Sequence, residues 1–275
     1  MDLSKNNKIL SVIIPSYNPG AYIYDCLNSI LEQNILQTSI EIIVVLNGTK
    51  EPYYSNLVNF SKSYSHIRIL YNPVKGVSRA RNMGLEFSSG THVLFVDDDD
   101  FISEGYLKEV IKQVKKNPNA VVFTNFLKFY KNGDIGNDYL TNTYNQLIND
   151  NKLSINKCRK LLSSSCGKAI PLNVINNIRF DNSIKISEDA LFMFEISKNY
   201  KSLILCGTSI AYYRRVRDSS ASRKRSSLME KVKVYSISSI SFTRIYLSSP
   251  LKYNLMFYLS RLLAASKFFL LTLKK

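Results

Sequence analysis

The sequence has few cysteines, and they follow no recognisable motif. The four residues, Cys26, Cys158, Cys166 and Cys206, are scattered over 275 positions and form no C-x-x-C pair. This spacing argues against a structural zinc site and against a disulfide framework, so a reducing compartment is the simpler expectation. The two histidines, His66 and His92, have no sequence cue that links them to a site, and we expect both to be structural. We therefore do not expect Cys166 to act as a nucleophile.

Long apolar runs are also missing. The first 15 residues, MDLSKNNKILSVIIP, contain no stretch long enough for a signal peptide. The apolar C-terminal segment is interrupted by Arg261 and Lys267, so no run of about 18 apolar residues predicts a spanning helix. The sequence also has no internal repeat and no low-complexity linker. We expect one compact body in two halves, residues 1–105 and 106–225, with a helical extension at residues 226–275.

Negative charge is scarce in the last quarter of the chain. The net charge is +16, and residues 201–275 carry 15 Lys and Arg against two acidic residues, a local net charge of +13. The first 200 residues carry only about +3. A basic tail on a near-neutral body indicates a polyanionic partner, either membrane headgroups or nucleic acid.

What the first half does contain is an alternation of strand and helix patterns. Continuous apolar runs predict buried strands at residues 9–15, 40–46, 67–71 and 91–96, and apolar residues at helical spacing predict helices through 23–31 and 77–87. Repeated strand–helix–strand units imply an α/β fold, with a mainly parallel sheet covered by helices on both faces. The polar loops PSYNPG, LNGTK, YNPVKG and VDDDD all follow strand ends. Because ligands bind beyond the carboxyl ends of such strands, we expect these loops to build one site.

The second half alternates less regularly. Ser103 is expected to cap a helix whose apolar positions lie between residues 107 and 114. Residues 120–130 and 202–213 each read as one strand, and KNGD reads as a hairpin turn. Helices are expected from Pro171, at 188–198 and after about residue 227, and residues 134–165 are expected to be loop with some helix.

Four consecutive aspartates, Asp97 to Asp100, follow the fourth predicted strand. Acidic residues in a loop often cap the next helix, close a turn or are simply solvated. Here, an apolar strand followed by Asp-x-Asp at the carboxyl edge of a parallel sheet places carboxylate oxygens where a ligand is expected. Such oxygens suit Mg²⁺ or Mn²⁺, which bridge carboxylates to substrate phosphates and offset the repulsion between like charges. The pattern therefore favours a divalent-metal site.

The sequence resembles a known family at this point. The segments SVIIPSYNPGAYIYDCLNSI, EIIVVLNGT, KGVSRARNMGLEFSSGTHVLFVDDDDFIS and SEDALF occur in the order and spacing of family 2 glycosyltransferases with the GT-A fold. The resemblance covers about residues 9–225. It implies an inverting transferase that uses Mn²⁺ or Mg²⁺ and moves a sugar from a nucleotide diphosphate, with UDP as the best match, to an acceptor hydroxyl. It also implies a role in bacterial surface polysaccharide or lipooligosaccharide synthesis.

The resemblance assigns roles to single residues on the donor side. Asp97 and Asp99 match the metal and ribose carboxylates, with Asp99 as the likelier direct metal ligand. Asp98, at a position that is often Ser in the family, is expected to contact the donor, and Asp100 supports the ligands or forms the turn. The other expected donor contacts are Pro15, Tyr17 and Asn18 in the first loop, Arg81 in the ARN segment, and Arg215 and Arg217 in the late YRRVRDSSAS segment. Family members commonly have an acidic pair where this chain has Leu46 and Asn47. Leu46 cannot accept a hydrogen bond from uracil, so the Asn47 amide oxygen is expected to do so.

On the acceptor side, Asp189 matches the residue proposed as catalytic base in the family. A carboxylate there would take the proton of the acceptor hydroxyl as the new bond forms. Acids in a first helical turn often only favour the helix dipole, and Glu188 is the alternative base or an acceptor contact. Lys168 either lines the acceptor site or belongs to a tight turn.

The C-terminal segment is predicted to form an amphipathic helix. Leu255, Tyr258, Leu259, Leu262 and Leu263 recur at helical spacing with basic residues between them, as in a core helix or in a helix lying on anionic lipid. Lipid-linked acceptors favour the second, so we expect a cytoplasmic protein that is peripheral on the inner face of the plasma membrane and binds no nucleic acid.

Two rival functions share parts of this pattern. A sugar-nucleotide nucleotidyltransferase would share the sheet, but it usually carries an N-terminal Gly-rich loop with a basic tail, which PSYNPG does not resemble. A basic nucleic-acid-binding protein would need basic and aromatic residues on a recognition element, and the charge here is diffuse.

Overall fold

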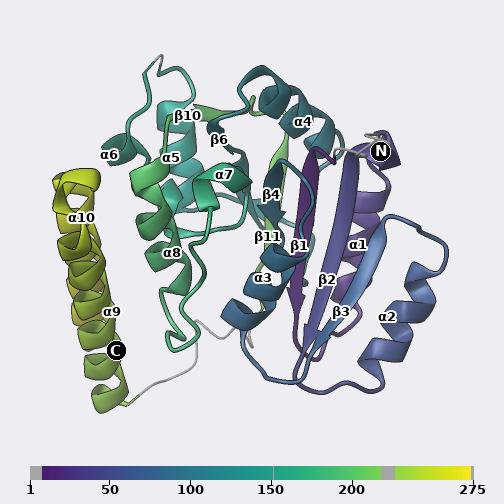
Figure 1. Cartoon of the computed structure of the whole chain (residues 1–275), viewed down its shortest axis with the longest axis horizontal. Helices are drawn as coiled ribbons and strands as arrows, with labels where there is room; N and C mark the ends of the chain where they lie inside the picture. Colours follow the sequence, from purple (N-terminus) through teal and green to yellow (C-terminus); the bar gives the residue numbers. More distant parts are fainter. Residues whose placement is uncertain (1–7, 151, 218–226, 274–275) are drawn as a thin grey trace, which may run out of the picture.

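The computed structural model describes residues 8–150, 152–217 and 227–273, and Figure 1 shows the arrangement of their elements. Within these residues, the larger sheet has seven strands in the order β10-β6-β9-β4-β1-β2-β3. Its strands are β1 (Leu10–Ser16), β2 (Ile40–Asn47), β3 (Ile67–Asn72), β4 (His92–Phe95), β6 (Ala120–Phe123), β9 (Lys168–Pro171) and β10 (Ser202–Leu205). Strands β1 to β4 pair in parallel, and β9 runs antiparallel to β4 and β6. The predicted α/β sheet is therefore present.

The first four strands form where the sequence predicted them because their apolar runs are covered on both faces. Every residue of β1, β2 and β4 is buried. The covering helices include α1 (Tyr22–Leu31), α2 (Tyr53–Ser61), α3 (Val77–Glu86), α4 (Tyr106–Lys116) and α8 (Glu188–Ile196). Helix α3 lies especially close to β1, since a Cβ added at Gly84 would stand 2.4 Å from Ile13 Cγ2. This close approach fixes the height of α3 above the sheet, and with it the position of Arg81.

A second sheet lies across the carboxyl edge of the first. It has the strand order β5-β11-β7-β8, with β5 (Phe101–Ile102), β11 (Ala211–Arg215), β7 (Asn125–Phe129) and β8 (Ile135–Gly136). The prediction of one strand at 120–130 is wrong, because Thr124 turns both its N–H (3.0 Å) and its hydroxyl (2.9 Å) to the carbonyl of Gly167. The chain then passes from the first sheet to the second. The single strand predicted at 202–213 is wrong in the same way, since β10 and β11 belong to different sheets.

The structure corrects two other local predictions and confirms a third. Ser103 does not cap α4, which begins after Gly105, and its hydroxyl accepts a hydrogen bond from the N–H of Ala211 instead. Residues 168–171 form β9, which the sequence did not reveal, and the short helix α7 (Leu172–Ile175) begins only after it. The KNGD turn is confirmed, with Tyr130 N–H bonded to Asp134 O at 2.9 Å.

The poorly patterned region and the connections contain short helices. Asp138 caps α5 (Tyr139–Leu147) through the N–H groups of Leu140 and Thr141. The remaining short elements are α6 (Ile155–Cys158), η1 (Gln37–Ser39), η2 (Leu161–Ser163), η3 (Ser197–Asn199) and η5 (Pro250–Lys252). All four cysteines are buried as free thiols.

The C-terminal extension is a pair of helices, α9 (Leu228–Ser248) and α10 (Leu255–Leu273), that stands beside α8 (Figure 1). It is anchored by Phe194 of α8, whose ring contacts those of Phe242, Tyr253 and Phe257. Arg261, one of the basic residues expected to face lipid, is instead buried, and its guanidinium bonds the carbonyl of Arg159. The side chain of Lys267 lies outside the described part. No helix in the described residues is long and apolar enough to cross a membrane.

Candidate active site

The four aspartates form a turn at the carboxyl end of β4, and each has a different partner. Asp100 closes the turn with its N–H on Asp97 O (3.1 Å), and its buried carboxylate accepts bonds from the Tyr212 hydroxyl (2.7 Å) and the Arg215 N–H (2.8 Å). Burial, together with the charges of Asp97 and Asp99, raises the pKa of Asp100 well above its ordinary value. The Tyr212 hydroxyl also accepts the N–H of Asp97 at 3.1 Å. Asp100 thus forms the turn, and Tyr212 of the second sheet fastens it.

The other three carboxylates lie nearer the surface. Asp98 accepts the hydroxyl of Ser16 at 2.6 Å, and burial raises its pKa to about 7. Asp97 is the most open of these, with 41% of its side chain exposed. Asp99 is 17% exposed and forms an ion pair with Arg217. Burial and then the charge of Asp97 raise the pKa of Asp99. Of the four carboxylates in the turn, those of Asp97 and Asp99 form ion pairs with arginines, so the turn has more carboxylates than these ion pairs offset.

This surplus of carboxylate charge fits a divalent cation. The described residues contain no group of three or more His, Cys, Asp or Glu arranged to hold a metal ion. Asp97 and Asp99 could supply two hard oxygen ligands, with the rest of the coordination left to substrate phosphates and water. Mg²⁺ and Mn²⁺ are commonly bound in this way.

Arg81 joins the aspartate turn to the acidic pair of α8. Its guanidinium reaches Asp97 Oδ1 (3.0 Å), Asp189 Oδ1 (2.5 Å) and Glu188 Oε1 (3.7 Å), and only 4% of its side chain is exposed. Burial acts to lower the pKa of Arg81, but the charges of Asp189 and Asp97 outweigh it and the pKa is raised. Burial and the charge of Asp189 raise the pKa of Glu188 to about 7. The structure thus brings together three predicted site segments that are far apart in the sequence.

Asp189 is held on its second oxygen as well. Its Oδ2 accepts the backbone N–H of Ser165 at 3.0 Å, while Oδ1 faces Arg81. About 19% of its side chain is exposed. Ser165 was not among the predicted site residues, and no pattern in the sequence indicated it, because it contributes through its backbone.

The first loop presents an aromatic ring at the edge of the sheet. Tyr17 is 42% exposed, its ring lies against Gly48, and Lys75 Nζ stands 3.9 Å above the ring centroid. Asn18 is exposed and has a left-handed φ of 47°, while Pro15 is buried in β1. Lys75 was missed as a single residue, although its loop, YNPVKG, was expected at the site. Its ammonium makes this corner basic.

The prediction for Asn47 needs correction. Asn47 is buried, its Nδ2 donates to Ser16 O at 2.6 Å, and its Oδ1 accepts the N–H of Gly76 at 2.9 Å. Both ends of the amide therefore hold the loops together. In this arrangement Asn47 has no amide oxygen to offer to a nucleotide base.

Arg215 and Arg217 differ in how far their side chains are exposed and in how many partners hold them. The side chain of Arg215 is 15% exposed, and it donates hydrogen bonds to Asp25 Oδ2 (2.9 Å) and Asp99 O (3.0 Å). Its guanidinium also lies over the ring of Tyr22. Arg217 is 36% exposed and faces Asp99. Arg217 is therefore the better placed of the two for a diphosphate. Residues 218–222 of the same segment lie outside the described residues.

Lys168 does not line an open acceptor site. It is fully buried in β9, and its ammonium donates to Ser164 O (2.5 Å) and Cys166 O (2.7 Å). The expected contact with an acceptor is therefore wrong for this arrangement.

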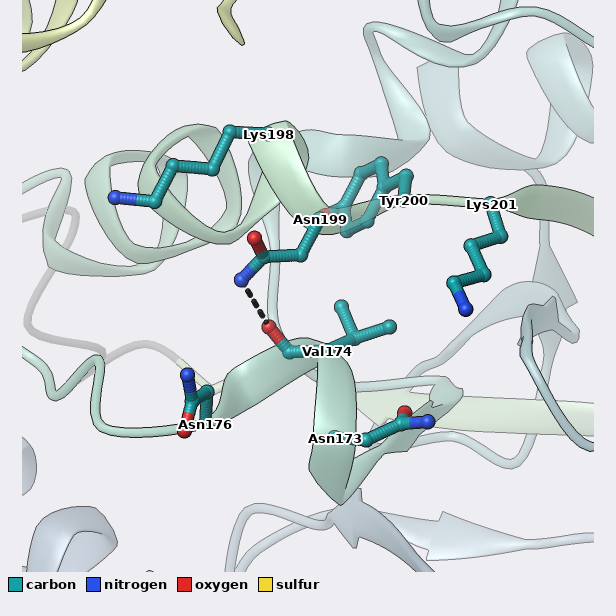
Figure 2. Close-up of a pocket in the computed structure, with 7 residues that line it drawn as sticks. All are labelled: Asn173, Val174, Asn176, Lys198, Asn199, Tyr200 and Lys201. Atoms are coloured by element: carbon teal, nitrogen blue, oxygen red, sulfur yellow. Dashed lines mark hydrogen bonds between the residues drawn. The ribbon is translucent and has the colours of Figure 1, made fainter.

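A surface pocket of about 410 Å³ lies away from these residues (Figure 2). It is lined by Asn173, Val174, Asn176, Lys198, Asn199, Tyr200 and Lys201, and Asn199 donates to Val174 O at 2.8 Å. Pro171, just before α7, pairs with His92 at the start of β4, whereas the aspartates follow the end of β4. The pocket thus lies at the opposite edge of the sheet and is separate from the candidate active site.

Comparisons with known proteins identify the family of the chain. The family model described as Glycosyl transferase family 2 matches residues 11–170. The minor teichoic acid biosynthesis protein GgaB of Bacillus subtilis (strain 168) is 28% identical over 228 residues, 82% of this chain and 25% of that protein. The poly(ribitol-phosphate) beta-N-acetylglucosaminyltransferase TarS of Staphylococcus aureus (strain Mu50 / ATCC 700699) is 26% identical over 209 residues, 74% of this chain and 35% of that protein. The chain spans about a quarter to a third of the length of these relatives.

Solved structures show the same fold. The crystal structure of S. aureus TarS 1-349 in complex with UDP-GlcNAc superimposes with a TM-score of 0.71 at 22% identity, over 86% of this chain and 66% of that one. This likeness confirms the predicted GT-A fold. Together with the family match over residues 11–170, it leads to one conclusion: the chain belongs to glycosyl transferase family 2.

Proposed function

We propose that this chain is an inverting glycosyltransferase that moves a sugar from a UDP-sugar to a hydroxyl of a glycan or lipid-linked acceptor. The observation that carries the proposal is the position of Arg81, which lies between a donor-side carboxylate, Asp97, and the acidic pair Glu188 and Asp189. One side of this group suits a nucleotide diphosphate, and the other suits an acceptor hydroxyl. The structural relative TarS, solved with UDP-GlcNAc and with UDP, supports UDP as the nucleotide.

The donor would lie along the carboxyl edge of the sheet. Tyr17 is placed to stack on a base or ribose, and Lys75 and Arg217 offer positive charge to the diphosphate. Asp97 and Asp99 would hold Mn²⁺ or Mg²⁺, which supplies charge stabilisation to the leaving diphosphate when bound. Arg217 would leave its ion pair with Asp99 as this ligand binds.

Asp189 would act as the base. Its carboxylate is fixed by two partners and partly open to solvent, so an acceptor hydroxyl can approach it. As the hydroxyl oxygen attacks the anomeric carbon, its proton passes to Asp189 and the bond to the diphosphate breaks on the opposite face. A single displacement of this kind inverts the configuration of the anomeric carbon. General-base catalysis of this type is typically worth about 10²–10⁴-fold in rate.

The test combines ligand binding with turnover. UDP with Mn²⁺ should raise the melting temperature, and Asp99→Ala should abolish this rise, whereas Glu104→Ala, which removes an exposed acid close by, should keep it. Asp189→Asn should keep the rise and lose UDP release from UDP-GlcNAc in the presence of acceptor. Near-normal turnover of Asp189→Asn would exclude the base role, and a UDP response that survives Asp99→Ala would exclude the metal site.

The names of the relatives support a surface polymer as acceptor. GgaB is named for minor teichoic acid biosynthesis, and TarS is named for transfer to poly(ribitol-phosphate). We infer that this chain acts in the same kind of pathway, on a hydroxyl-rich polymer or its lipid-linked precursor. Sugar transfer from UDP-GlcNAc to a poly(ribitol phosphate) acceptor, compared with a neutral glucan, measures this preference. Equal transfer to both would contradict it.

We also propose that the α9–α10 pair rests on an anionic membrane surface. Ile240, Leu247 and Leu263 are 66%, 64% and 70% exposed, and the exposed Arg244 and Lys252 lie among such apolar residues. A shallow hollow of about 380 Å³ on α9, lined by Ser239, Ile240, Thr243, Arg244 and Leu247, belongs to the same face. Apolar side chains with interspersed cations suit the interface of an anionic bilayer.

Vesicle binding tests this surface. The protein should sediment with phosphatidylglycerol-containing vesicles at low salt, and the pair of changes Leu247→Glu and Leu263→Glu should abolish it. Ile135→Glu, which changes an exposed apolar residue of the β8 hairpin, is the control. Failure to bind such vesicles, or binding that is unchanged in the double variant, would refute the proposal.

A further inference from the structure

Lys168 is a buried cation without an anionic partner. None of its surface is exposed, and no carboxylate in the described chain lies within ion-pair distance of its ammonium. The ring centroids of Phe123 and Phe126 each lie 5.7 Å from Nζ. Burying a charge among apolar groups is costly, and the cost falls when the charge is hydrogen-bonded. The hydrogen bonds of the ammonium indicate its role.

Both hydrogen bonds go to the loop between η2 and β9. Lys168 Nζ donates to the carbonyl oxygens of Ser164 and Cys166, at 2.5 and 2.7 Å. The Ser164 carbonyl and the Ser165 N–H belong to one peptide unit, and in a trans peptide these two groups point in opposite directions. Fixing Ser164 O on the buried ammonium therefore aims the Ser165 N–H outward. It meets Asp189 Oδ2 at 3.0 Å.

The rest of the loop leaves little freedom around this peptide. Gly167 has a left-handed φ of 65°, and a Cβ there would stand 2.2 Å from Phe126 Cζ. The Gly167 carbonyl accepts both the N–H and the hydroxyl of Thr124. Cys166 pairs with Phe95 at the end of β4, two residues before Asp97. The loop thus connects the aspartate turn to Asp189, with the lysine ammonium beneath it.

We propose that Lys168 is a positioning residue for Asp189, which it holds in place through the Ser164–Ser165 peptide. The inference rests on the proposed function, because it takes Asp189 as the base. With Oδ2 on Ser165 and Oδ1 on Arg81, the carboxylate has one orientation toward the acceptor side. Burial lowers the pKa of Lys168 to about 8, against the opposing influence of Cys166 and Asp189, so the ammonium keeps its proton at pH 7.

The test separates positioning from folding. Lys168→Met removes the charge and the donor with little change in volume, and Lys168→Arg restores both. The control is Val114→Ala, which removes buried apolar volume from α4, away from this loop. For Lys168→Met we expect UDP release from UDP-GlcNAc to fall by about 10- to 100-fold in kcat, with donor KM and the UDP–Mn²⁺ melting shift within about twofold of the parent, since small misplacements of a reacting group cost this much. Lys168→Arg should recover part of kcat, and Val114→Ala should lower only the melting temperature.

A double variant shows whether Lys168 acts through Asp189. Asp189→Asn combined with Lys168→Met should be no slower than Asp189→Asn alone, because a base that is absent needs no positioning. Multiplied losses in the double variant, or a Lys168→Met enzyme with the kcat of Val114→Ala, would overturn the inference while the proposed function stands. If Lys168→Met does not fold, Lys168→Gln is compared by the same criteria. Normal turnover of Asp189→Asn would instead reject the proposed function itself.

Discussion

The change Tyr212→Phe tests how the second sheet holds the aspartate turn. The Tyr212 side chain is 1% exposed, and its hydroxyl makes two bonds, accepting from Asp97 N–H at 3.1 Å and donating to Asp100 Oδ2 at 2.7 Å. Phenylalanine keeps the ring and its contact with Phe126. The change therefore removes the two hydrogen bonds and little else.

The expected loss of stability follows from the groups left without a partner. The Asp97 N–H loses its bond, and the Asp100 carboxylate keeps only the N–H of Arg215. A buried polar group left without a partner costs about 1–3 kcal/mol, and Asp100 keeps one of its two bonds, so the two losses together should cost about 2–4 kcal/mol. For a domain of this size, 1 kcal/mol corresponds to roughly 2–4 °C in melting temperature. Tyr212→Phe should therefore melt about 5–15 °C below the parent.

Tyr213→Phe is the matched control. Tyr213 is the next residue of β11, it is only partly buried, and its ring stacks on Phe101 at a centroid distance of 4.8 Å. Thermal denaturation should show little change for Tyr213→Phe, and the UDP–Mn²⁺ melting shift should weaken only in Tyr212→Phe, whose aspartates are no longer fixed. If the melting temperatures of the two variants differ by no more than about 1–2 °C, the hydroxyl of Tyr212 contributes little to stability and its proposed role is refuted.

Three further changes probe the surroundings of the site. Arg81→Met leaves Asp97, Glu188 and Asp189 without their shared cation, so chemical denaturation should show a loss of about 3 kcal/mol or more in the free energy of unfolding. The control Arg79→Met changes an exposed arginine and should lose less than about 0.5 kcal/mol. Equal losses would contradict the role of Arg81 as the cation shared by the three carboxylates. Burial lowers the pKa of His92 from 6.5 to about 4, so its contribution to stability is full above pH 6.5 and is lost as the pH falls toward 4, by about 2 kcal/mol at pH 5. Denaturation of His92→Gln should show a smaller drop between pH 7.5 and 5 than the parent, and parallel curves would argue against a buried neutral ring. Gly167→Ala should destabilise the fold by about 1–3 kcal/mol more than Gly133→Ala, because both have positive φ but only the first places a Cβ against a ring; similar melting temperatures would show that Phe126 moves aside.

The sequence predicted the first half of the fold more accurately than the second. Strands β1 to β4 are continuous apolar runs between polar loops, and the structure places them within one or two residues of the predicted ranges. Strand β9 was missed because its four residues, KAIP, begin with a lysine, and a charged residue is rarely fully buried. The strand predicted at 120–130 is divided, since the bonds of Thr124 to Gly167 turn the chain where the apolar pattern continues. The strand predicted at 202–213 is divided between the two sheets as β10 and β11.

The candidate site shows the same division. The aspartates, Arg81 and Asp189 could be named from motifs, because their side chains carry the chemistry and lie at strand and helix ends. Ser165 could not, since it contributes only a backbone N–H. Lys168 was named, but as a residue that contacts the acceptor, whereas its ammonium is buried and bonded to the Ser164 carbonyl. Asn47 looked available to a nucleotide base, yet its amide is used by Ser16 and Gly76.

The amino-acid pattern by itself determined that a parallel sheet forms and that polar loops, one of them with four aspartates, follow the carboxyl ends of its strands, because apolar runs and local breaks encode both. Only the tertiary structure decided which carboxylates remain open and which are used for support. Asp97 and Asp100 are three residues apart and identical in chemistry, but Asp100 is 3% exposed beneath Tyr212, whereas 41% of the Asp97 side chain is exposed. That difference comes from a strand more than 100 residues away, and the free energy of burying or solvating a carboxylate depends on such neighbours.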